Sequence, residues 1–272
     1  MCLNSIFMRV IIYYLYSINH TILTFVLFCR MVGSFCVDSI DKVWSISIKI
    51  TTSESSENTY QHCSICDEPA TVINFPIQEK RSYLYCQVCN FRFLSVDARL
   101  SKEAEEVYYR LHENDIHDLG YQNYVRPLYE KILELVVPSG SGLDFGCGPG
   151  PVLAHMLGKK GYSITLYDPL FNPDSRALEK PYDFIVCSEV AEHFKNPIYE
   201  FSRLYSMLNQ DGYLAVMTSL YRPGIDFSKW HYRRDPTHVS FYSLDTIISL
   251  ANKVGFSSVW SDKVKVMILK KQ

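Results

Sequence analysis

The chain has 272 residues and a formal net charge of −2, with 27 Lys and Arg against 29 Asp and Glu. This length and an apolar content of 47% suit one large globular domain, alone or with one small domain. They exclude a disordered tail, a collagen-like repeat and a polytopic membrane protein. The balanced charge also argues against a strongly basic nucleic-acid binder.

An apolar stretch without formal charge occupies residues 10–29. It is long enough to cross a hydrocarbon core of about 30 Å. Its polar side chains, such as Asn19 and His20, weaken that interpretation, because polar groups are costly at the bilayer midplane. A membrane anchor, an extension outside the functional fold and a packed helix stay open. We assign residues 1–59 to this leader and a polar linker, and expect a cytoplasmic protein with or without a membrane tether.

Two Cys-x-x-Cys pairs follow, separated by 19 residues, and they consist of Cys63 with Cys66 and Cys86 with Cys89. Two such pairs complete a tetrahedral site of four thiolates, which suits zinc. The residues between them are β-branched and aromatic, as in strands. The pattern predicts a zinc ribbon over residues 60–100 with a folding role, in a reducing compartment. Four unrelated buried cysteines or a redox pair are the alternatives.

Residues 101–137 show the periodicity of two helices, with Tyr124 and Leu128 on one face of the second. We expect this helical bridge to pack on the domain that follows. An alternative is that it brings Tyr121, Tyr124 and Arg126 over a bound cofactor as part of a lid.

The stretch Asp144–Gly150 joins a short apolar strand to a helix and holds glycines at alternate positions, Gly146, Gly148 and Gly150. Glycine permits positive φ and a close approach of the backbone to a ligand, and the helix N-terminus offers free N–H groups. A second strand ends in Asp168, 18 residues further on. In doubly wound folds a carboxylate at this place binds the ribose hydroxyls of an adenosine-containing ligand.

This glycine loop, with an acid at the end of the second strand, resembles the class I S-adenosylmethionine-dependent methyltransferases over about residues 120–272. The resemblance implies an α/β fold: a doubly wound Rossmann-like sheet over residues 138–272 that ends in an antiparallel hairpin. It also implies S-adenosylmethionine as cofactor, in contact with Tyr124, Asp144, Gly146, Cys147, Gly148, Gly150, Asp168, Pro169, Ser188 and Glu189.

The chain departs from the family in one place. Only 14 residues separate Asp168 from Asp183, so the usual third strand must be very short or absent. A nicotinamide-dependent dehydrogenase would use a related fold, but the third glycine is not at its spacing.

A stretch Glu189-x-x-Glu192-His193 ends the predicted fourth strand, where it would face the sulfonium. It resembles the ubiquinone-pathway O-methyltransferases and the small-RNA 3′-terminal 2′-O-methyltransferases. In the latter, such a stretch and a further His hold a divalent metal, which implies Mg²⁺ or Mn²⁺ as a second metal here. The polar, aromatic loop after strand five offers His238 as the first partner and His231 as the second. The alternative is that Glu189 binds the cofactor or a helix end, Glu192 caps a helix, and His193 is a general base or only packs. For the loop, the alternative is a structural connection with ion-paired arginines.

We therefore predict an S-adenosylmethionine-dependent methyltransferase that acts on an oxygen of a small molecule, with acid/base or metal assistance. One alternative is RNA 2′-O-methylation, with the ribbon, Arg233 and Arg234 holding the strand. Another is a non-catalytic adaptor whose zinc ribbon binds a protein partner. The oligomeric state stays open.

Overall fold

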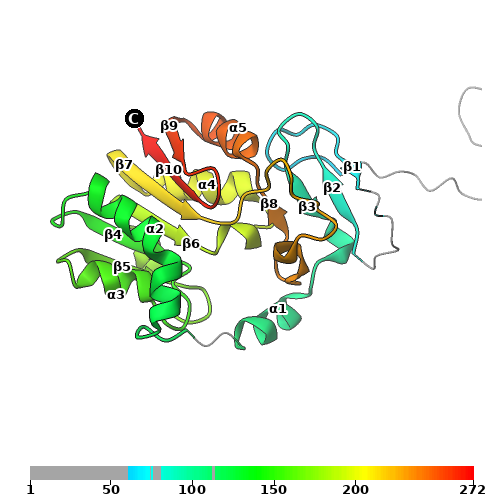
Figure 1. Ribbon diagram of the computed structural model, residues 1–272. Coiled ribbons are helices and arrows are strands. Elements are labelled where there is room, and N and C mark those ends of the chain that lie inside the picture. Colours follow the sequence, from blue (N-terminus) through cyan, green and yellow to red (C-terminus); the bar gives the residue numbers. More distant parts are fainter. Residues whose placement is uncertain (1–60, 74, 76–80, 112–113) are drawn as a thin grey trace, which may run out of the picture. The chain divides into compact units, whose positions relative to one another are not determined.

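The computed structural model describes residues 61–73, 75, 81–111 and 114–272 (Figure 1). The predicted apolar segment at residues 10–29 lies outside these ranges. Within them, no helix is long and apolar enough to cross a membrane. The expected localisation with a membrane tether is therefore corrected, because the described helices include no candidate span.

The larger sheet has six strands in the order β5-β4-β6-β7-β10-β9. The first four are parallel and comprise β4 (Ser141–Phe145), β5 (Ser163–Tyr167), β6 (Tyr182–Ser188) and β7 (Leu208–Met217). The last two form an antiparallel hairpin of β9 (Phe256–Ser261) and β10 (Val266–Lys271). This sheet confirms the predicted α/β fold class.

The strand β5 lies at the edge of the sheet, where a third strand would otherwise pair with it. In place of that strand, the short link to β6 holds a tight turn closed by the Asp168–Asn172 bridge and the 3₁₀ helix η2 (Ser175–Leu178). The 14-residue separation predicted a third strand that is very short or absent, and no strand lies between β5 and β6 in the chain.

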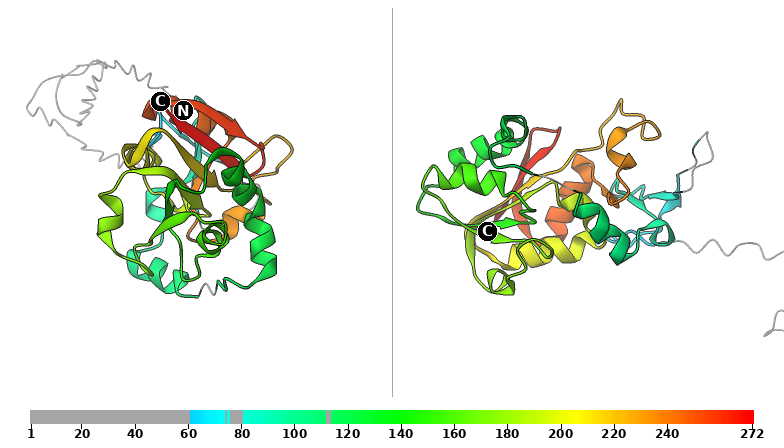
Figure 2. Two further views of the ribbon diagram at one scale, coloured as in Figure 1. Left: turned by 90° about the vertical axis from the view of Figure 1, so that its left-hand side faces the viewer. Right: turned by 90° about the horizontal axis from the view of Figure 1, so that it is seen from below.

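Helices cover both faces of this sheet (Figure 2). One face packs on α2 (Leu119–Leu135) and α3 (Val152–Gly158), and the other on α4 (Pro197–Ser206) and α5 (Leu244–Val254). The reason is the two-residue period of a strand, which sends Phe184 to the first core and Ile185 to the second. Each fully buried side chain of this kind contributes about 1.5–3 kcal/mol to stability. The sheet is therefore held rigidly between two apolar layers.

The four-cysteine region forms a smaller antiparallel sheet in the order β1-β2-β3-β8. Its strands are β1 (Thr71–Val72), β2 (Tyr83–Tyr85) and β3 (Arg92–Leu94), preceding the 3₁₀ helix η1 (Val96–Ala98). The fourth strand, β8 (Ser240–Phe241), comes from the loop after β7 and pairs with β3. The ribbon and the methyltransferase-like part therefore share one sheet and one core cluster. The predicted boundaries at residues 60–100, 101–137 and 138–272 stay a prediction.

Candidate active site

A cavity of about 1040 Å³ opens at the carboxyl ends of β4, β5 and β6. Its walls also include the helix α1 (Lys102–Tyr109) and the 3₁₀ helices η3 (Ala191–His193) and η4 (His231–Arg234). Parallel strands commonly place ligands at this edge. The residues predicted to contact cofactor all line this cavity, and they are Tyr124, Asp144, Gly146, Cys147, Gly148, Gly150, Asp168, Pro169, Ser188 and Glu189.

The glycine loop has a backbone conformation that favours glycine. Gly146 and Gly148 have φ of 76° and 64°, in the left-handed region. A Cβ on Gly146 would lie 2.4 Å from a methyl group of Val190, and one on Gly150 would lie 1.9 Å from the Asn114 carbonyl oxygen. The loop is therefore pressed between the end of β6 and the chain that precedes α2, with its backbone at the cavity wall.

The Asp168 carboxylate is fixed in place by three backbone N–H groups. Oδ1 accepts from Leu170 at 2.8 Å and from Phe171 at 3.0 Å, and Oδ2 accepts from Gly148 at 3.1 Å. Oδ1 uses both of its lone pairs in these bonds, whereas Oδ2 keeps a further lone pair for a ligand. The arrangement thus holds an acceptor of hydrogen bonds rigidly at the rim of the glycine loop.

Two further carboxyls in the cavity wall are strongly perturbed by burial. Burial raises the pKa of Asp144, which is 4% exposed, to about 7. Burial and the neighbouring Glu192 raise the pKa of Glu189 to about 8, although the Tyr124 hydroxyl acts to lower it. Glu189 also adopts a left-handed φ of 53°, which costs a residue with a Cβ about 1–3 kcal/mol. Such perturbed groups in a cavity are typical of functional sites.

Glu192, His193 and His238 form a cluster in which the potential ligand atoms all lie within 4.8 Å of one another. Glu192 is fully buried, and neither carboxylate oxygen has a hydrogen-bond partner at ordinary distance in the described residues, although the nearby Tyr232 hydroxyl interacts with it. His238 Nε2 lies 3.9 Å from Glu192 Oε1, and the His193 and His238 ring centroids are 5.0 Å apart. Burial lowers the pKa of His238, against the opposing effect of Glu192, and so favours the neutral ring.

His231 lies apart from this cluster, although it lines the same cavity and is exposed. The predicted lid is also only partly assembled. Tyr121 and Tyr124 line the cavity, whereas exposed Arg126 donates to Asn123 at 3.0 Å. The buried face of α2 instead includes Val125 and Leu128.

Several cavity residues escaped the sequence-based prediction. Tyr109 of α1 packs edge-on against His193 at a centroid distance of 5.3 Å, and Lys195 forms a 2.6 Å ion pair with Glu105 of the same helix. Nothing in the spacing of α1 indicated that it would lie against η3. The hydroxyl of buried Tyr232 contacts Thr218 Oγ1 at 2.9 Å. In the sequence, only the position of Tyr232 beside His231 in the aromatic loop could have indicated that it lines the cavity.

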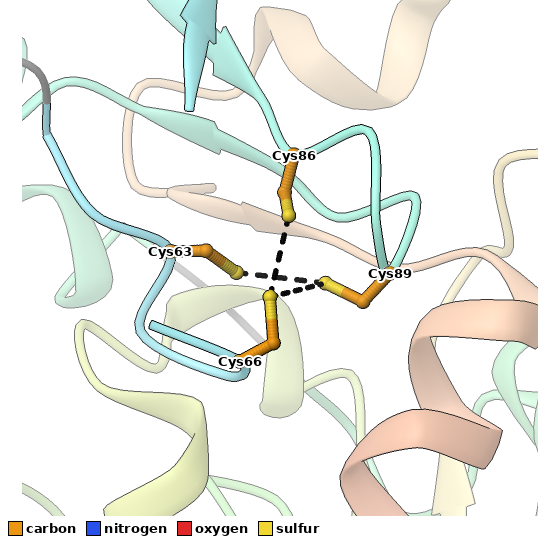
Figure 3. A group of neighbouring side chains, drawn as sticks. All are labelled: Cys63, Cys66, Cys86 and Cys89. Atoms are coloured by element: carbon orange, nitrogen blue, oxygen red, sulfur yellow. Dashed lines mark hydrogen bonds between the residues drawn. The ribbon is translucent and has the colours of Figure 1, made fainter. Parts of the chain in front are cut away.

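The four cysteines converge on a common centre (Figure 3), and none of them lines this cavity. The Sγ–Sγ distances are 3.5 Å for Cys63–Cys89, 3.4 Å for Cys66–Cys86 and 3.7 Å for Cys66–Cys89. A tetrahedron with metal–sulfur bonds of about 2.3 Å has edges of about 3.8 Å. The donor set and its dimensions are therefore compatible with a zinc ribbon.

A family model described as "Methyltransferase domain" matches residues 118–261. No curated protein matches the chain. Among solved structures, magnesium protoporphyrin IX methyltransferase from Synechocystis PCC 6803 with bound SAH is 16% identical, over 63% of this chain and 95% of that chain, with a TM-score of 0.44. An O-methyltransferase family protein from Burkholderia thailandensis is 11% identical, over 63% and 60%, with a TM-score of 0.43. CalO1, a methyltransferase in calicheamicin biosynthesis, is 14% identical, over 62% and 58%, with a TM-score of 0.42.

These structures show what the chain is similar to, at identities too low to carry a substrate over. The family match covers more than half of the chain and includes the glycine loop, Asp168 and the Glu189–His193 stretch. It confirms that the chain belongs to the methyltransferase-domain family and is an S-adenosylmethionine-dependent methyltransferase.

Proposed function

We propose that the enzyme transfers the methyl group of S-adenosylmethionine to an oxygen of a small-molecule acceptor, with Glu192 and His238 receiving the acceptor's proton. The observation that carries this proposal is the fully buried Glu192 carboxylate, which lies 3.9 Å from His238 Nε2 and has no hydrogen-bond partner at ordinary distance in the described residues. A buried carboxylate without a close donor is costly. A proton or a cation that arrives during turnover would offset that cost.

The proposed chemistry is an in-line displacement. The acceptor oxygen forms a bond to the methyl carbon while the carbon–sulfur bond breaks, and its electron pair stays on sulfur to give S-adenosylhomocysteine. The acceptor's proton passes to the Glu192 carboxylate or to the neutral His238 ring at Nε2. General bases of this kind typically contribute about 10²–10⁴-fold to the rate.

The cofactor would occupy the part of the cavity beside the glycine loop. Asp168 would accept a hydrogen bond from a ribose hydroxyl through Oδ2, which accepts only from Gly148 among the described residues. Asp144 and Glu189 add two carboxyl groups to the same wall. S-adenosylmethionine carries a sulfonium and an ammonium cation, and both would stabilise the ionised forms of these carboxyls.

The charge of the cavity favours a small acceptor over RNA. Its lining holds more acids than cations: the acids are Glu105, Glu106, Asp144, Asp168, Glu189, Glu192, Glu200 and Asp235, and the cations are Lys102, Lys195 and Arg203. One of these cations, Lys195, is already paired with Glu105. A phosphate backbone needs uncompensated Lys and Arg. The volume of about 1040 Å³ is at the upper end for one small ligand and suits a cofactor and an acceptor together.

A divalent cation at Glu192, His193 and His238 is a second candidate for the activating group. The observation that favours it is the 4.8 Å cluster, in which both imidazoles present Nε2. Carboxylate and imidazole ligands suit Mn²⁺ or Zn²⁺ better than Mg²⁺. When bound, such a cation would lower the pKa of an acceptor hydroxyl. We also infer that the four-cysteine cluster holds a structural zinc ion, supported by its Sγ–Sγ distances.

The test is a search for labelled products with the full chain and methyl-labelled S-adenosylmethionine in a cell extract that contains both small molecules and RNA. Wild type is compared with Glu192→Gln, which keeps the size of the side chain, and with Glu106→Gln on the cavity wall as a matched control. We expect wild type and Glu106→Gln to label a small molecule and Glu192→Gln to lose about 100-fold of the rate. Calorimetry should give all three the same affinity for S-adenosylhomocysteine.

Three outcomes would overturn the proposal. Label that appears in RNA with a steep salt dependence would favour RNA methylation. A complete absence of cofactor binding would favour the adaptor. Wild-type rates in the Glu192→Gln variant would rule out Glu192 as the proton acceptor. Loss of activity with a chelator, restored by Mn²⁺ but not by a change of pH, would instead select the cation as the activating group.

A further inference from the structure

Both imidazoles of the active-site cluster are oriented by backbone carbonyls of one loop, residues 231–239. His238 Nδ1 lies 2.6 Å from the Tyr232 carbonyl oxygen, and His193 Nδ1 lies 3.0 Å from that of Thr237. A carbonyl oxygen can only accept, so each neutral ring carries its hydrogen on Nδ1. Each Nε2 therefore presents its lone pair, and His238 Nε2 presents it toward Glu192.

The cysteine ribbon donates hydrogen bonds to this loop. Arg81, just before β2, donates through Nη2 to the carbonyls of Arg233 and Arg234 at 3.0 and 3.2 Å, and through Nη1 to that of Asp235 at 3.2 Å. These carbonyls end the 3₁₀ helix η4, where helical partners run out. The hydroxyl of fully buried Tyr83 donates to the Arg233 carbonyl at 3.1 Å. One guanidinium thus closes the end of the helix that carries the Tyr232 carbonyl.

A second set of hydrogen bonds joins the same loop to the cluster. Leu94 of β3 donates its N–H to the Val239 carbonyl at 2.9 Å, and the Val239 N–H donates to the Glu192 carbonyl at 2.9 Å. Ser240 Oγ donates to the Phe194 carbonyl at 2.7 Å. The ribbon, the loop and η3 are therefore connected continuously, and a displacement of the loop would move all three cluster residues.

We propose that the ribbon is a built-in positioning element of the active site, and that Arg81 is the positioning residue that sets the tautomer and direction of His238 and His193. Its benefit for methyl transfer rests on the proposed function, but the orientation of the two rings does not. The competing explanation is that Arg81 only fastens the ribbon to the enzyme. That explanation predicts a loss of stability with no change in either ring.

The test reads the tautomers directly, with the full chain labelled with ¹⁵N-histidine and spectra of the imidazole nitrogens recorded at about pH 8.5, where neutral rings predominate. His193→Gln and His238→Gln assign the two rings among the eight histidines of the chain. We expect the Nδ1–H form for both in wild type. In Arg81→Ala the population of the Nδ1–H form should fall by about twofold or more, because rings that lose their carbonyl partners become solvated and exchange between tautomers. Arg81→Lys and added guanidinium ion should each restore part of it.

Arg92→Ala is the matched control. Arg92 is an arginine of the same small sheet, and its guanidinium carbon lies 3.7 Å from the centre of the Tyr221 ring. Its guanidinium donates a hydrogen bond to the Asn90 carbonyl, which lies outside residues 231–239. The Arg92→Ala substitution should lower the melting temperature without changing the tautomer of His193 or of His238. Unchanged tautomers in a folded Arg81→Ala, or equal changes in both variants, would overturn the proposal. Binding of S-adenosylhomocysteine, measured in parallel, tests the proposed function separately.

Discussion

Two clusters of potential metal ligands occur in the part of the chain that the structure describes, and they differ in donors and in access. The first consists of four cysteines whose sulfur atoms contact one another, three of them at most 2% exposed. The second consists of Glu192, His193 and His238 in the wall of the large cavity. The first uses soft donors and is complete with four of them. The second uses harder donors and leaves room for a further ligand.

This difference separates a site that stabilises the fold from a site suited to chemistry. Four thiolates around one ion leave no coordination position for a substrate, so the binding energy goes into folding. A carboxylate and two imidazoles that face a cavity can exchange a proton or hold an ion beside a substrate. The two clusters are also connected, because the ribbon that contains the first shares a sheet with β8, next to His238.

The largest effect should come from breaking the first cluster. Cys63→Ser removes one of four thiolates, so zinc content measured by elemental analysis should fall from about one per chain to well below half. Because structural zinc supplies about 10–16 kcal/mol in zinc-finger peptides, the ribbon should unfold and the melting temperature should drop. Cys147→Ser, at a buried cysteine outside the cluster, is the control for zinc content. Full zinc content in Cys63→Ser would contradict the assignment.

The role of the second cluster can be tested by comparing a variant of His238 with a variant of the neighbouring His231. His238→Gln should lower the rate of methyl transfer by about 10²–10⁴-fold, because it removes the acceptor of the proton beside Glu192. His231→Gln should stay within about threefold of wild type, because that exposed side chain lies outside the cluster. Rates are measured with the labelled product found in the extract search. Equal losses in both variants would show that the loop, and not the cluster, governs the rate.

Asp168→Ala tests the cofactor side of the cavity without touching either cluster. We expect an affinity for S-adenosylhomocysteine about 100-fold lower by calorimetry, since hydrogen bonds to a charged acceptor contribute about 1.5–3 kcal/mol each. The control is Asp174→Ala, an acid paired with Arg176 and outside the cavity lining. An affinity for S-adenosylhomocysteine close to that of the wild type in Asp168→Ala would show that Asp168 does not bind the ribose.

The smallest expected effect is a pH dependence of cofactor affinity. The pKa of Glu189 is raised to about 8 and that of Asp144 to about 7, so both carboxyls gain charge as the pH rises through these values. A cation binds the charged form better, so affinity for S-adenosylmethionine should rise about tenfold between about pH 6 and pH 9. The stability of the free protein should fall over the same range of pH. The pKa of Glu189 is higher in the folded than in the unfolded chain, so ionising this carboxyl costs stability as the pH rises from its ordinary pKa of 4.5 to about 8.

Two controls separate the contributions to this pH dependence. Glu189→Gln should flatten the rise, because an amide does not ionise. S-adenosylhomocysteine, which lacks the sulfonium charge, should show a smaller rise than S-adenosylmethionine with the wild-type protein. An affinity that does not change with pH would mean that neither carboxyl contacts a cationic part of the cofactor.

Local spacing was sufficient where a feature is built from neighbours in the chain. The Cys-x-x-Cys pairs and the alternate glycines are such features, because a tight loop needs only a few adjacent residues. The absent third strand also followed from a short separation, since 14 residues between Asp168 and Asp183 cannot hold a strand and its crossover. These parts of the fold and of the cavity wall were therefore predictable.

Long-range pairing was not predictable. The hydrogen bond from Arg81 to the Arg233 carbonyl spans 152 positions, and nothing in the sequence near either residue points to the other. The pairing of β8 with β3 is similar, because β8 has only two residues and no strand pattern of its own. Tyr109 reached the cavity only because α1 lies against η3.

The family, the cofactor loop, the donor types of both clusters and the course of the main sheet were predictable, because these depend on residue identity at short separations. The sequence also favoured His238 over His231 as the partner of the Glu192 stretch, and His238 does lie beside Glu192. The contacts by which the ribbon holds the loop behind them became visible in the fold alone, because they join residues far apart in the chain. Only the fold of that loop against the ribbon gives each side chain its direction.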